Sequence, residues 1–232
     1  MQLLEHKWAL VTGSSRGVGQ QIVRGLAQRK CNVIVHGRDL EHLQNTLNLL
    51  EPLGVNVHAV AGELATAAGV QALIDGVRQG PGHVDILYNN AAIQNPWKPI
   101  WDITMDEWLH SFQINLFAMI ALCNAFAPPM QQRGYGRIIN LTSGIKDVPN
   151  LAPYSVSKAA VDKYTRDLAA ELRGTNVLAN TLDPGWLRTD MGGSNAEGEP
   201  ESVLPGALVP ALLQDHGPSG RLFAAQDFKY LA

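Results

Sequence analysis

Tyr154 and Lys158 are the residues of this sequence whose types and spacing most directly suggest chemistry. They stand four positions apart in a segment of helical periodicity, so their side chains should share one helix face. A phenol with an ordinary pKa of about 10 transfers protons poorly near neutral pH, and a neighbouring ammonium group lowers that pKa by favouring the phenolate. At about 4 Å and an effective dielectric constant of about 20, this attraction is worth about 4 kcal/mol. We therefore expect Lys158 to lower the pKa of Tyr154 and make it a proton donor or acceptor.

Ser143 is the third candidate for this chemistry, and it is needed because a Tyr and a Lys four positions apart also occur by chance on solvated helices. It ends a buried apolar run in Asn140-Leu141-Thr142-Ser143-Gly144. Parallel sheets bind their ligands beyond the carboxyl ends of the strands, where the Ser143 hydroxyl could hold a substrate oxygen. The alternative is a serine that only forms the turn before Gly144.

A glycine-rich segment, Thr12-Gly13-Ser14-Ser15-Arg16-Gly17-Val18-Gly19, follows the first predicted strand and opens the first predicted helix. Glycines there let backbone N–H groups close around a pyrophosphate at a helix N-terminus. The same glycines could form a purely structural turn, but their place between a strand and a helix favours nucleotide binding. We predict cofactor contacts from Gly13, Ser15, Arg16, Gly17, Val18 and Gly19.

The end of the second predicted strand, His36-Gly37-Arg38-Asp39, discriminates between nicotinamide cofactors. An acidic side chain there hydrogen-bonds the 2′-hydroxyl of NAD(H), whereas a cation accommodates the 2′-phosphate of NADP(H). Gly37 stands where the acid is expected, and Arg38 offers a planar fork to phosphate, with Arg16 adding charge. The sequence thus predicts NADP(H). In the alternative interpretation Arg38 is an ordinary surface arginine and Asp39 only caps the following helix.

The hydrophobic pattern predicts the scaffold that positions these residues. Short apolar runs bounded by turn residues alternate with longer segments of helical periodicity, as in βα units feeding a parallel sheet. The predicted strands cover residues 8–11, 32–36, 55–61, 84–88, 137–141, 177–182 and 221–224, and the predicted helices cover 18–29, 40–53, 67–78, 105–130, 153–172 and 202–213. We expect a Rossmann-type, doubly wound α/β fold with a seven-stranded, mostly parallel sheet, helices on both faces, and one domain over residues 1–232. Residues 192–200, polar and rich in glycine, should form a mobile loop within it.

Composition narrows the classes of partner. The 18 Lys and Arg against 21 Asp and Glu give a net charge of -3, and no basic run could neutralise a row of phosphates, so nucleic acid is a poor candidate. Cys31 and Cys123 stand alone, which predicts no disulfide, no metal site and two unreactive thiols in a reducing compartment.

Two segments of the sequence are long or apolar enough to be compared with a secretory signal or a membrane span. Glu5, His6 and Lys7 interrupt the N-terminal apolar stretch, unlike the layout of a secretory signal. Residues 111–132 carry no charge and are long enough to span a bilayer, but they hold Gln113, Asn115 and Asn124 and end near Pro128-Pro129, so a buried helix fits better. We expect a cytoplasmic protein with no membrane partner.

Together these motifs resemble the short-chain dehydrogenase/reductase family over essentially the whole length of the chain. The resemblance rests on Thr12 to Gly19, Asn89-Asn90-Ala91, Asn115, Ser143, Tyr154-Ser155-Val156-Ser157-Lys158, and Pro184-Gly185 followed by Thr189. It implies that Tyr154 is the catalytic acid/base and Ser143 the donor to the substrate oxygen, that Lys158 tunes Tyr154 and binds the ribose, and that Asn115 takes part in a proton relay. It also implies cofactor contacts from Glu63, Leu64, Asn90, Ala91, Pro184, Gly185 and Thr189. For Asn115 a second interpretation stays open, because a buried amide can also serve only to satisfy a kinked helix.

The chain departs from the family pattern in four places. Glu63 stands where an aspartate is usual, Ala92 replaces a glycine, and Ser143 and Tyr154 are closer in sequence than usual. The tail of residues 221–232 lacks the glycine-rich ending common in tetrameric members. These departures bear on the adenine contact, on substrate closure and on assembly.

The sequence thus predicts an enzyme that transfers a hydride between NADP(H) and a carbonyl compound or secondary alcohol. A non-catalytic NADP(H) sensor or scaffold is the alternative, and dehydration or epimerisation at the same site is a minority hypothesis. The substrate walls should come from residues 93–97, Ile145, Lys146, Pro149 and Trp186, although tryptophans often only pack and lysines are often solvated. Residues 116–123 are apolar on every helix face, which predicts a homodimer or homotetramer.

Overall fold

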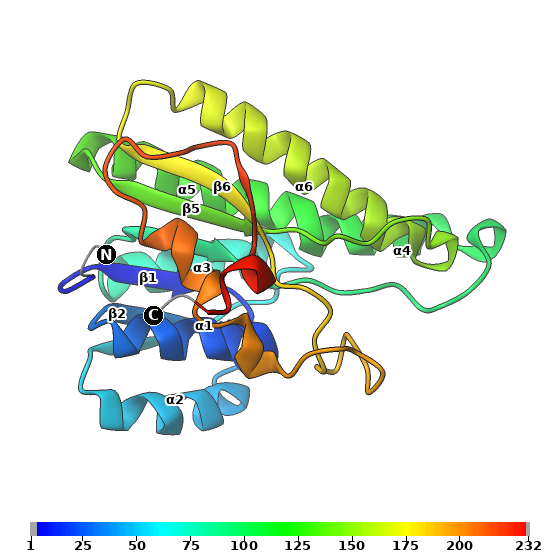
Figure 1. Cartoon of the computed structure of the whole chain (residues 1–232), viewed down its shortest axis with the longest axis horizontal. Helices are drawn as coiled ribbons and strands as arrows, with labels where there is room; N and C mark the ends of the chain where they lie inside the picture. The colour runs from blue at the N-terminus through cyan, green and yellow to red at the C-terminus, as the bar shows by residue number, and fades with distance from the viewer. Residues whose placement is uncertain (1–3, 231–232) are drawn as a thin grey trace.

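The computed structural model describes residues 4–230, and in them the chain forms a seven-stranded sheet in the order β3-β2-β1-β4-β5-β6-β7 (Figure 1). All six strand pairs are parallel. The strands are β1 (Trp8–Val11), β2 (Asn32–Gly37), β3 (Val57–Ala61), β4 (Ile86–Asn89), β5 (Gly136–Leu141), β6 (Val177–Asp183) and β7 (Leu222–Ala224). The strand order reverses between β1 and β4, where doubly wound sheets bind their ligands. The predicted fold class is confirmed.

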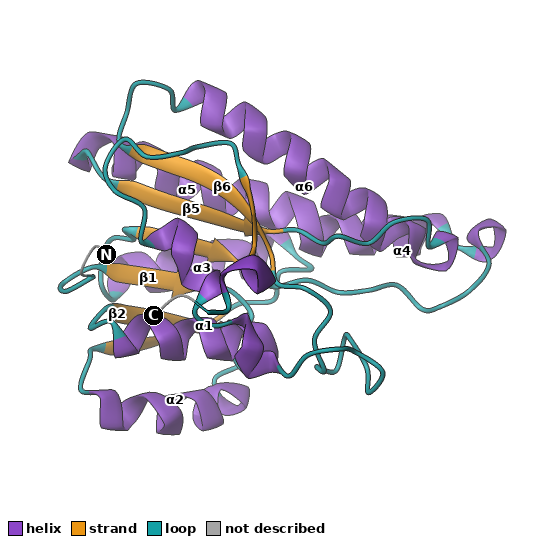
Figure 2. Ribbon diagram, viewed as in Figure 1, coloured by secondary structure: helices purple, strands orange, loops and turns teal. Residues whose placement is uncertain are grey.

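Helices cover both faces of this sheet (Figure 2). They are α1 (Gly17–Gln28), α2 (Gln44–Leu50), α3 (Ala67–Gln79), α4 (Met105–Phe112), α5 (Ala118–Arg133) and α6 (Ala152–Glu171). Side chains alternate along β1, so Leu10 joins the apolar core beneath α3, α5 and α6, while Val11 joins the core beneath α1. A strand buried on both sides in this way reads as a continuous apolar run.

The predicted helix over residues 105–130 is interrupted. A capping box starts α4, because Thr104 and Glu107 each accept a hydrogen bond from the other's backbone. Residues Gln113–Phe117 then form a π-helical turn, and α5 continues through Pro128 and Pro129 to Arg133. The combined helix has the length and mean hydropathy of a membrane span, and 44% of that window is buried inside the fold.

Two other predicted helices are corrected. The helix predicted over residues 202–213 is wrong: two short 3-10 segments, η6 (Pro200–Val203) and η7 (Gly206–Ala211), take its place. Pro205 and Pro210 lack the N–H groups that a continuous helix needs. The helix predicted over residues 40–53 is α-helical only in α2. A 3-10 turn lies on either side of it, at Glu41–Leu43 and at Glu51–Leu53.

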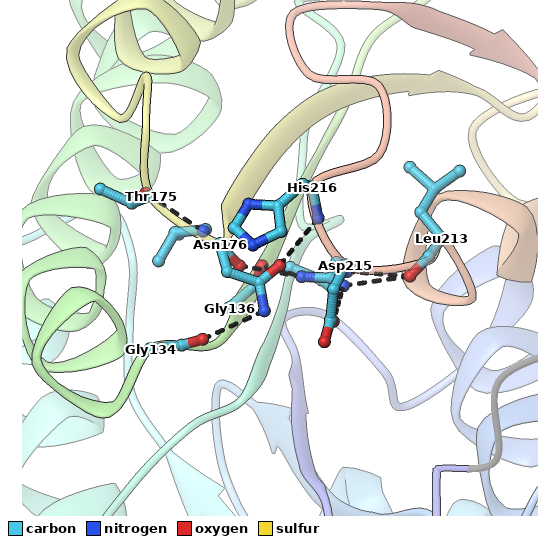
Figure 3. Close-up of polar contacts among 9 residues, drawn as sticks. Gly134, Gly136, Thr175, Asn176, Leu213, Asp215 and His216 are labelled. Atoms are coloured by element: carbon cyan, nitrogen blue, oxygen red, sulfur yellow. Dashed lines mark hydrogen bonds and ion pairs between the residues drawn. The ribbon is translucent and has the colours of Figure 1, made fainter.

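A buried arginine near the start of β5 joins this strand to the chain before β7. It lies at the end of β5 opposite the carboxyl end, where parallel sheets bind ligands. Arg137 is fully buried, and its guanidinium donates to Gly136 O, Asn176 O and Leu213 O and to the Asp215 carboxylate at 3.0 Å. Asn176 adds two links, donating to Gly134 O and accepting from the backbone N–H of His216 (Figure 3). These bonds hold residues 213–216 against β5.

Candidate active site

A cleft of about 630 Å³ opens at the carboxyl ends of the strands. It is lined by almost all of the residues predicted to touch a cofactor: Gly13, Ser15, Arg16, Gly17, Val18, Gly19, Arg38, Glu63, Leu64, Asn90, Ala91, Tyr154, Lys158, Pro184 and Thr189. Gly185, predicted with them, does not line the cleft; neither do Ser143 and Asn115. The structure therefore brings together side chains that lie up to 176 positions apart, from Gly13 to Thr189.

The glycine-rich loop has the shape of a phosphate cradle. Gly13 and Gly17 have φ values of 63° and 57°, which favour glycine. A Cβ at Gly19 would lie 2.4 Å from Gly13 O and 2.5 Å from Asn90 Nδ2, so no larger residue fits there. The N-terminus of α1 and a backbone stripped of side chains fit the pyrophosphate of a dinucleotide.

Asn90 and Thr12 hold this cradle from the adjacent strand. Asn90 Nδ2 donates to Thr12 O at 2.8 Å and to Gly13 O at 3.1 Å. Thr12 Oγ1 in turn accepts the backbone N–H groups of Asn90 and Ala91, each at 3.0 Å. Asn90, which the resemblance places near the adenosine ribose, thus supports the phosphate loop with its amide.

His36 is a site residue that sequence reasoning missed. Its buried ring lies between two loops that line the cleft: Nδ1 accepts the N–H of Gly13 at 3.1 Å, and Nε2 is 2.9 Å from Gly62 O. Since a carbonyl oxygen only accepts, Nε2 carries the proton. Burial lowers the pKa of His36 to about 4, so the ring stays neutral near pH 7. A polar ring within a buried strand needs such partners, which was the available signal.

The end of β2 carries the groups predicted to select the cofactor. Arg38 lines the cleft, as does His42, which the sequence did not single out. Asp39 accepts the backbone N–H of His42 at 3.0 Å, so it caps the turn as the alternative interpretation proposed. Arg16, expected to add charge here, instead pairs with Asp190 at 3.0 Å across the mouth of the cleft, both side chains being largely exposed.

Glu63 and Thr189 are partly committed to backbone contacts. Glu63 Oε1 accepts the N–H of Ala65 at 2.9 Å just before α3, and Thr189 Oγ1 accepts the N–H of Gly192 at 3.1 Å. Both side chains keep a place in the cleft wall. The loop after β6 is further ordered by Arg188, which also lines the cleft and pairs with Glu199.

Tyr154 marks the substrate end of the cleft, and Ser143 lies next to it. Tyr154 is buried near the start of α6, and the Ser143 hydroxyl, two residues after β5, is close enough to influence its phenol. Burial raises the pKa of Tyr154, the hydrogen bond with Ser143 lowers it, and the nearby Asp183 carboxylate raises it again. The net direction is upward, which keeps the phenol protonated.

The predicted effect of Lys158 on Tyr154 is therefore wrong for this structure. The Lys158 ammonium lies 5.8 Å from the centre of the Tyr154 ring and donates to Leu141 O at 2.8 Å. Burial lowers the pKa of Lys158 to about 8, because the charged form loses its water. The lysine does lie beside the tyrosine, as the four-residue spacing predicts, but desolvation outweighs charge in both groups.

Asn115 lies in the π-helical turn and clamps the loop after β4. Its Oδ1 accepts the N–H of Ile93 at 2.8 Å, while its Nδ2 donates to Ile93 O at 2.9 Å and to Ser157 Oγ at 3.0 Å. The amide thus ties together the loop after β4, the π-helical turn and α6. Its bond to α6 is made at Ser157, the residue before Lys158. The implied role in a proton relay stays a prediction.

The predicted substrate walls differ in burial. Ile93 lines the cleft and Asn95 is buried, its amide donating to Asn150 O. Trp97 is 67% exposed, and Trp186 is 55% exposed with its indole N–H on Gly192 O. Within residues 4–230 no group of three or more His, Cys, Asp or Glu side chains could hold a metal ion, and Cys31 and Cys123 are buried free thiols.

A doubly wound sheet with a glycine cradle at its switch point and a Tyr/Lys pair beside it defines the class of nucleotide-dependent oxidoreductases. The model of the short chain dehydrogenase family matches residues 7–200. The chain belongs to this family.

Individual proteins are also similar to this chain in sequence or structure. The uncharacterized oxidoreductase YvrD of Bacillus subtilis is 33% identical over 202 residues, which are 86% of this chain and 76% of that protein. Dehydrogenase/reductase SDR family member 4 of Sus scrofa is 35% identical, covering 81% of this chain and 68% of that protein. A metagenomic short-chain oxidoreductase solved in complex with NADP is 28% identical with a TM-score of 0.85, covering 96% of this chain and 99% of the other.

Proposed function

We propose that the protein is an NADP(H)-dependent reductase of carbonyl compounds that also oxidises the corresponding secondary alcohols. The observation that carries the proposal is that Tyr154 and Lys158 line the same cleft as the glycine cradle, with Ser143 next to the phenol. A sensor that only binds nucleotide has no use for a buried phenol paired with a serine at this position.

The bound nicotinamide supplies or accepts the hydride. Ser143 and Tyr154 would both hydrogen-bond the substrate oxygen, which fixes the carbonyl and stabilises the charge that develops on it. Tyr154 would give its phenolic proton to that oxygen, and its raised pKa keeps the proton in place until the oxygen becomes basic. Lys158, whose ammonium lies 5.8 Å from the centre of the Tyr154 ring, would bind the cofactor ribose.

NADP(H) is the proposed cofactor because the residues at the end of β2 suit a phosphate. Gly37 carries no acid, the nearby Asp39 is held by the His42 backbone, and Arg38 lines the cleft. The complex of the metagenomic relative with NADP supports the same choice. Arg16 would have to leave Asp190 to add its charge, an exchange that an exposed ion pair permits at little cost.

The test is a panel of aldehydes and ketones with the purified protein, followed by the absorbance of NADPH and NADH. We expect turnover with NADPH on part of the panel. Tight NADPH binding without turnover on carbonyls or alcohols would instead favour the sensor or scaffold function. Consumption of substrate without a change in the cofactor's redox state would point to dehydration or epimerisation.

We also propose a homo-oligomer. Leu109 of α4, Phe117 of the π-helical turn and Val156 of α6 are about half exposed, on helices that pack against one another. A second copy of the chain would cover these apolar side chains. Light scattering at micromolar concentration should give at least twice the monomer mass, and a monomer would contradict the proposal.

A further inference from the structure

Asp183 is a carboxylate beside the loop of Ser143, and the proposed reaction does not use it. It ends β6, directly beside the end of β5, since Leu141 pairs with Leu182. Its Oδ1 accepts the N–H of Gly185 at 2.9 Å, which fixes the side chain in one orientation.

The second oxygen of this carboxylate lies against the catalytic serine's loop. A Cβ built on Gly144 would lie 2.8 Å from Asp183 Oδ2, so Oδ2 approaches the backbone immediately after Ser143. Any side chain larger than that of glycine at position 144 would separate the two. Among the hydrogen bonds and ion pairs of residues 4–230, Oδ2 takes no partner, and its lone pairs are free to accept a donor.

The charge of Asp183 also reaches the reacting group. It raises the pKa of Tyr154, which lies next to Ser143. A fixed negative charge thus lies near the two hydroxyls that would hold the substrate oxygen. The carbon atoms next to that oxygen would then lie within range of the Asp183 charge.

We propose that Asp183 is a specificity-determining residue that selects substrates with a hydroxyl or ammonium group on a carbon next to the carbonyl and disfavours those with a carboxylate there. The inference rests on the proposed carbonyl reductase function. A donor on that carbon would complete a charge-assisted hydrogen bond with Oδ2, whereas an apolar group would displace water from the carboxylate without replacing its hydrogen bonds. A carboxylate would face repulsion from a like charge at short range.

Three ketones of nearly equal size test the proposal: hydroxyacetone, butanone and pyruvate. We expect kcat/KM with NADPH to be at least about tenfold higher for hydroxyacetone than for butanone, and lowest for pyruvate. Asp183→Asn keeps an acceptor for Gly185 but removes the charge, so it should reduce the preference for hydroxyacetone and raise the relative rate with pyruvate by about tenfold. Asp227→Asn, an exposed carboxylate on the segment after β7, is the matched control and should leave all three ratios unchanged.

The possible results separate the two proposals. Absence of turnover on any carbonyl compound would overturn the reductase function. Turnover on a wider panel but not on hydroxyacetone would overturn the role of Asp183 alone. An equal change of all three rates in Asp183→Asn, accompanied by a lower Tm, would assign Asp183 to the β6 turn and also overturn it, whereas an altered ratio at unchanged NADPH KM would support it.

Discussion

At the end of the cleft that contains the glycine cradle, polar side chains hold neighbouring loops together, whereas at the substrate end large aromatic side chains are exposed to solvent. His36 and Asn90 are each bonded to the glycine-rich segment, and Thr46 Oγ1 donates to Ser14 O at 2.9 Å. By contrast, Trp97 is 67% exposed and Trp186 55% exposed.

This difference separates what the fold fixes from what a ligand must complete. The hydrogen bonds from His36, Asn90 and Thr46 fix the shape of the cradle, so little ordering should be required when a nucleotide binds. The exposed aromatic side chains of the substrate end have fewer supports, with one hydrogen bond from Trp186 to Gly192 O, and can adjust to a ligand. Substitutions at the nucleotide end should therefore change affinity through geometry, and those at the substrate end should change selectivity with little effect on the fold.

Tyr154→Phe should give the largest effect and divide the two ends most clearly. It removes only the hydroxyl, so turnover should fall by at least about a hundredfold, the low end for loss of a general acid. NADPH affinity, measured by fluorescence titration, should stay within a few fold. Lys158→Met should impair both quantities, because it would lose a ribose contact as well as the charge beside the phenol. Full activity in the phenylalanine variant would remove Tyr154 from the mechanism.

His36→Phe should break the nucleotide end selectively. The ring is replaced at similar size, but Gly13 N–H and Gly62 O lose their partners, so we expect the KM for NADPH to rise about tenfold or more. The asparagine of His36→Asn can still accept the Gly13 N–H, so the KM for NADPH should rise less in this variant. The KM for the carbonyl substrate should not change. Equal increases in both KM values would show that His36 supports the whole fold rather than the cradle.

The same ring predicts how stability depends on pH. The pKa of His36 falls from 6.5 to about 4 on folding, so the unfolded chain binds the proton more readily. Stability is then fully present above about pH 6.5 and is lost as the pH falls toward 4, by up to about 3 kcal/mol. Urea unfolding at about pH 7 and pH 4.5 should show this loss in the wild type and a smaller one in His36→Phe. An identical loss in both proteins would assign it to other groups.

Arg38→Asp should act on the nucleotide end with a smaller effect. We expect the unmodified enzyme to use NADPH at least about tenfold better than NADH in kcat/KM, a difference of about 1.4 kcal/mol. The aspartate would narrow or reverse that ratio, because it repels the 2′-phosphate and can accept the 2′-hydroxyl. Steady-state kinetics with both cofactors measure it. Equal efficiency of the unmodified enzyme with NADPH and NADH would contradict the assignment.

Trp97→Ala tests the substrate end of the cleft and should give the smallest effect. The indole is mostly exposed, so the free energy of unfolding should change by no more than about 0.5 kcal/mol. The KM for NADPH should stay constant, while the KM values of bulky carbonyl substrates change a few fold. A large fall in Tm would mean that the substrate end is as rigid as the cradle.

The sequence predicted best what depends on neighbouring residues. The strands, the glycine cradle and the Tyr154–Lys158 pair all follow from short-range pattern, and the structure has them in place. The pKa of Tyr154 could not be predicted, because it depends on burial and on Asp183, which is distant in sequence. The same holds for His36, whose partners lie on two other strand ends. The prediction of a helix over residues 202–213 was wrong because it gave more weight to the apolar spacing than to the two prolines.

The arginine inside the sheet has a consequence for incomplete chains. Arg137 is fully buried, and it relies on Leu213 O and Asp215, which are 76 and 78 positions further along. A chain that stops short of residue 213 would bury a cation with two of its acceptors missing, and an uncompensated buried charge costs several kcal/mol, a large part of the stability of a domain. Such a chain contains the cradle, Ser143, Tyr154 and Lys158, yet we expect it to be degraded or to aggregate instead of persisting as a partly active enzyme. Cellular quality control would in this way discard prematurely terminated copies, although every residue placed in the reaction precedes the break.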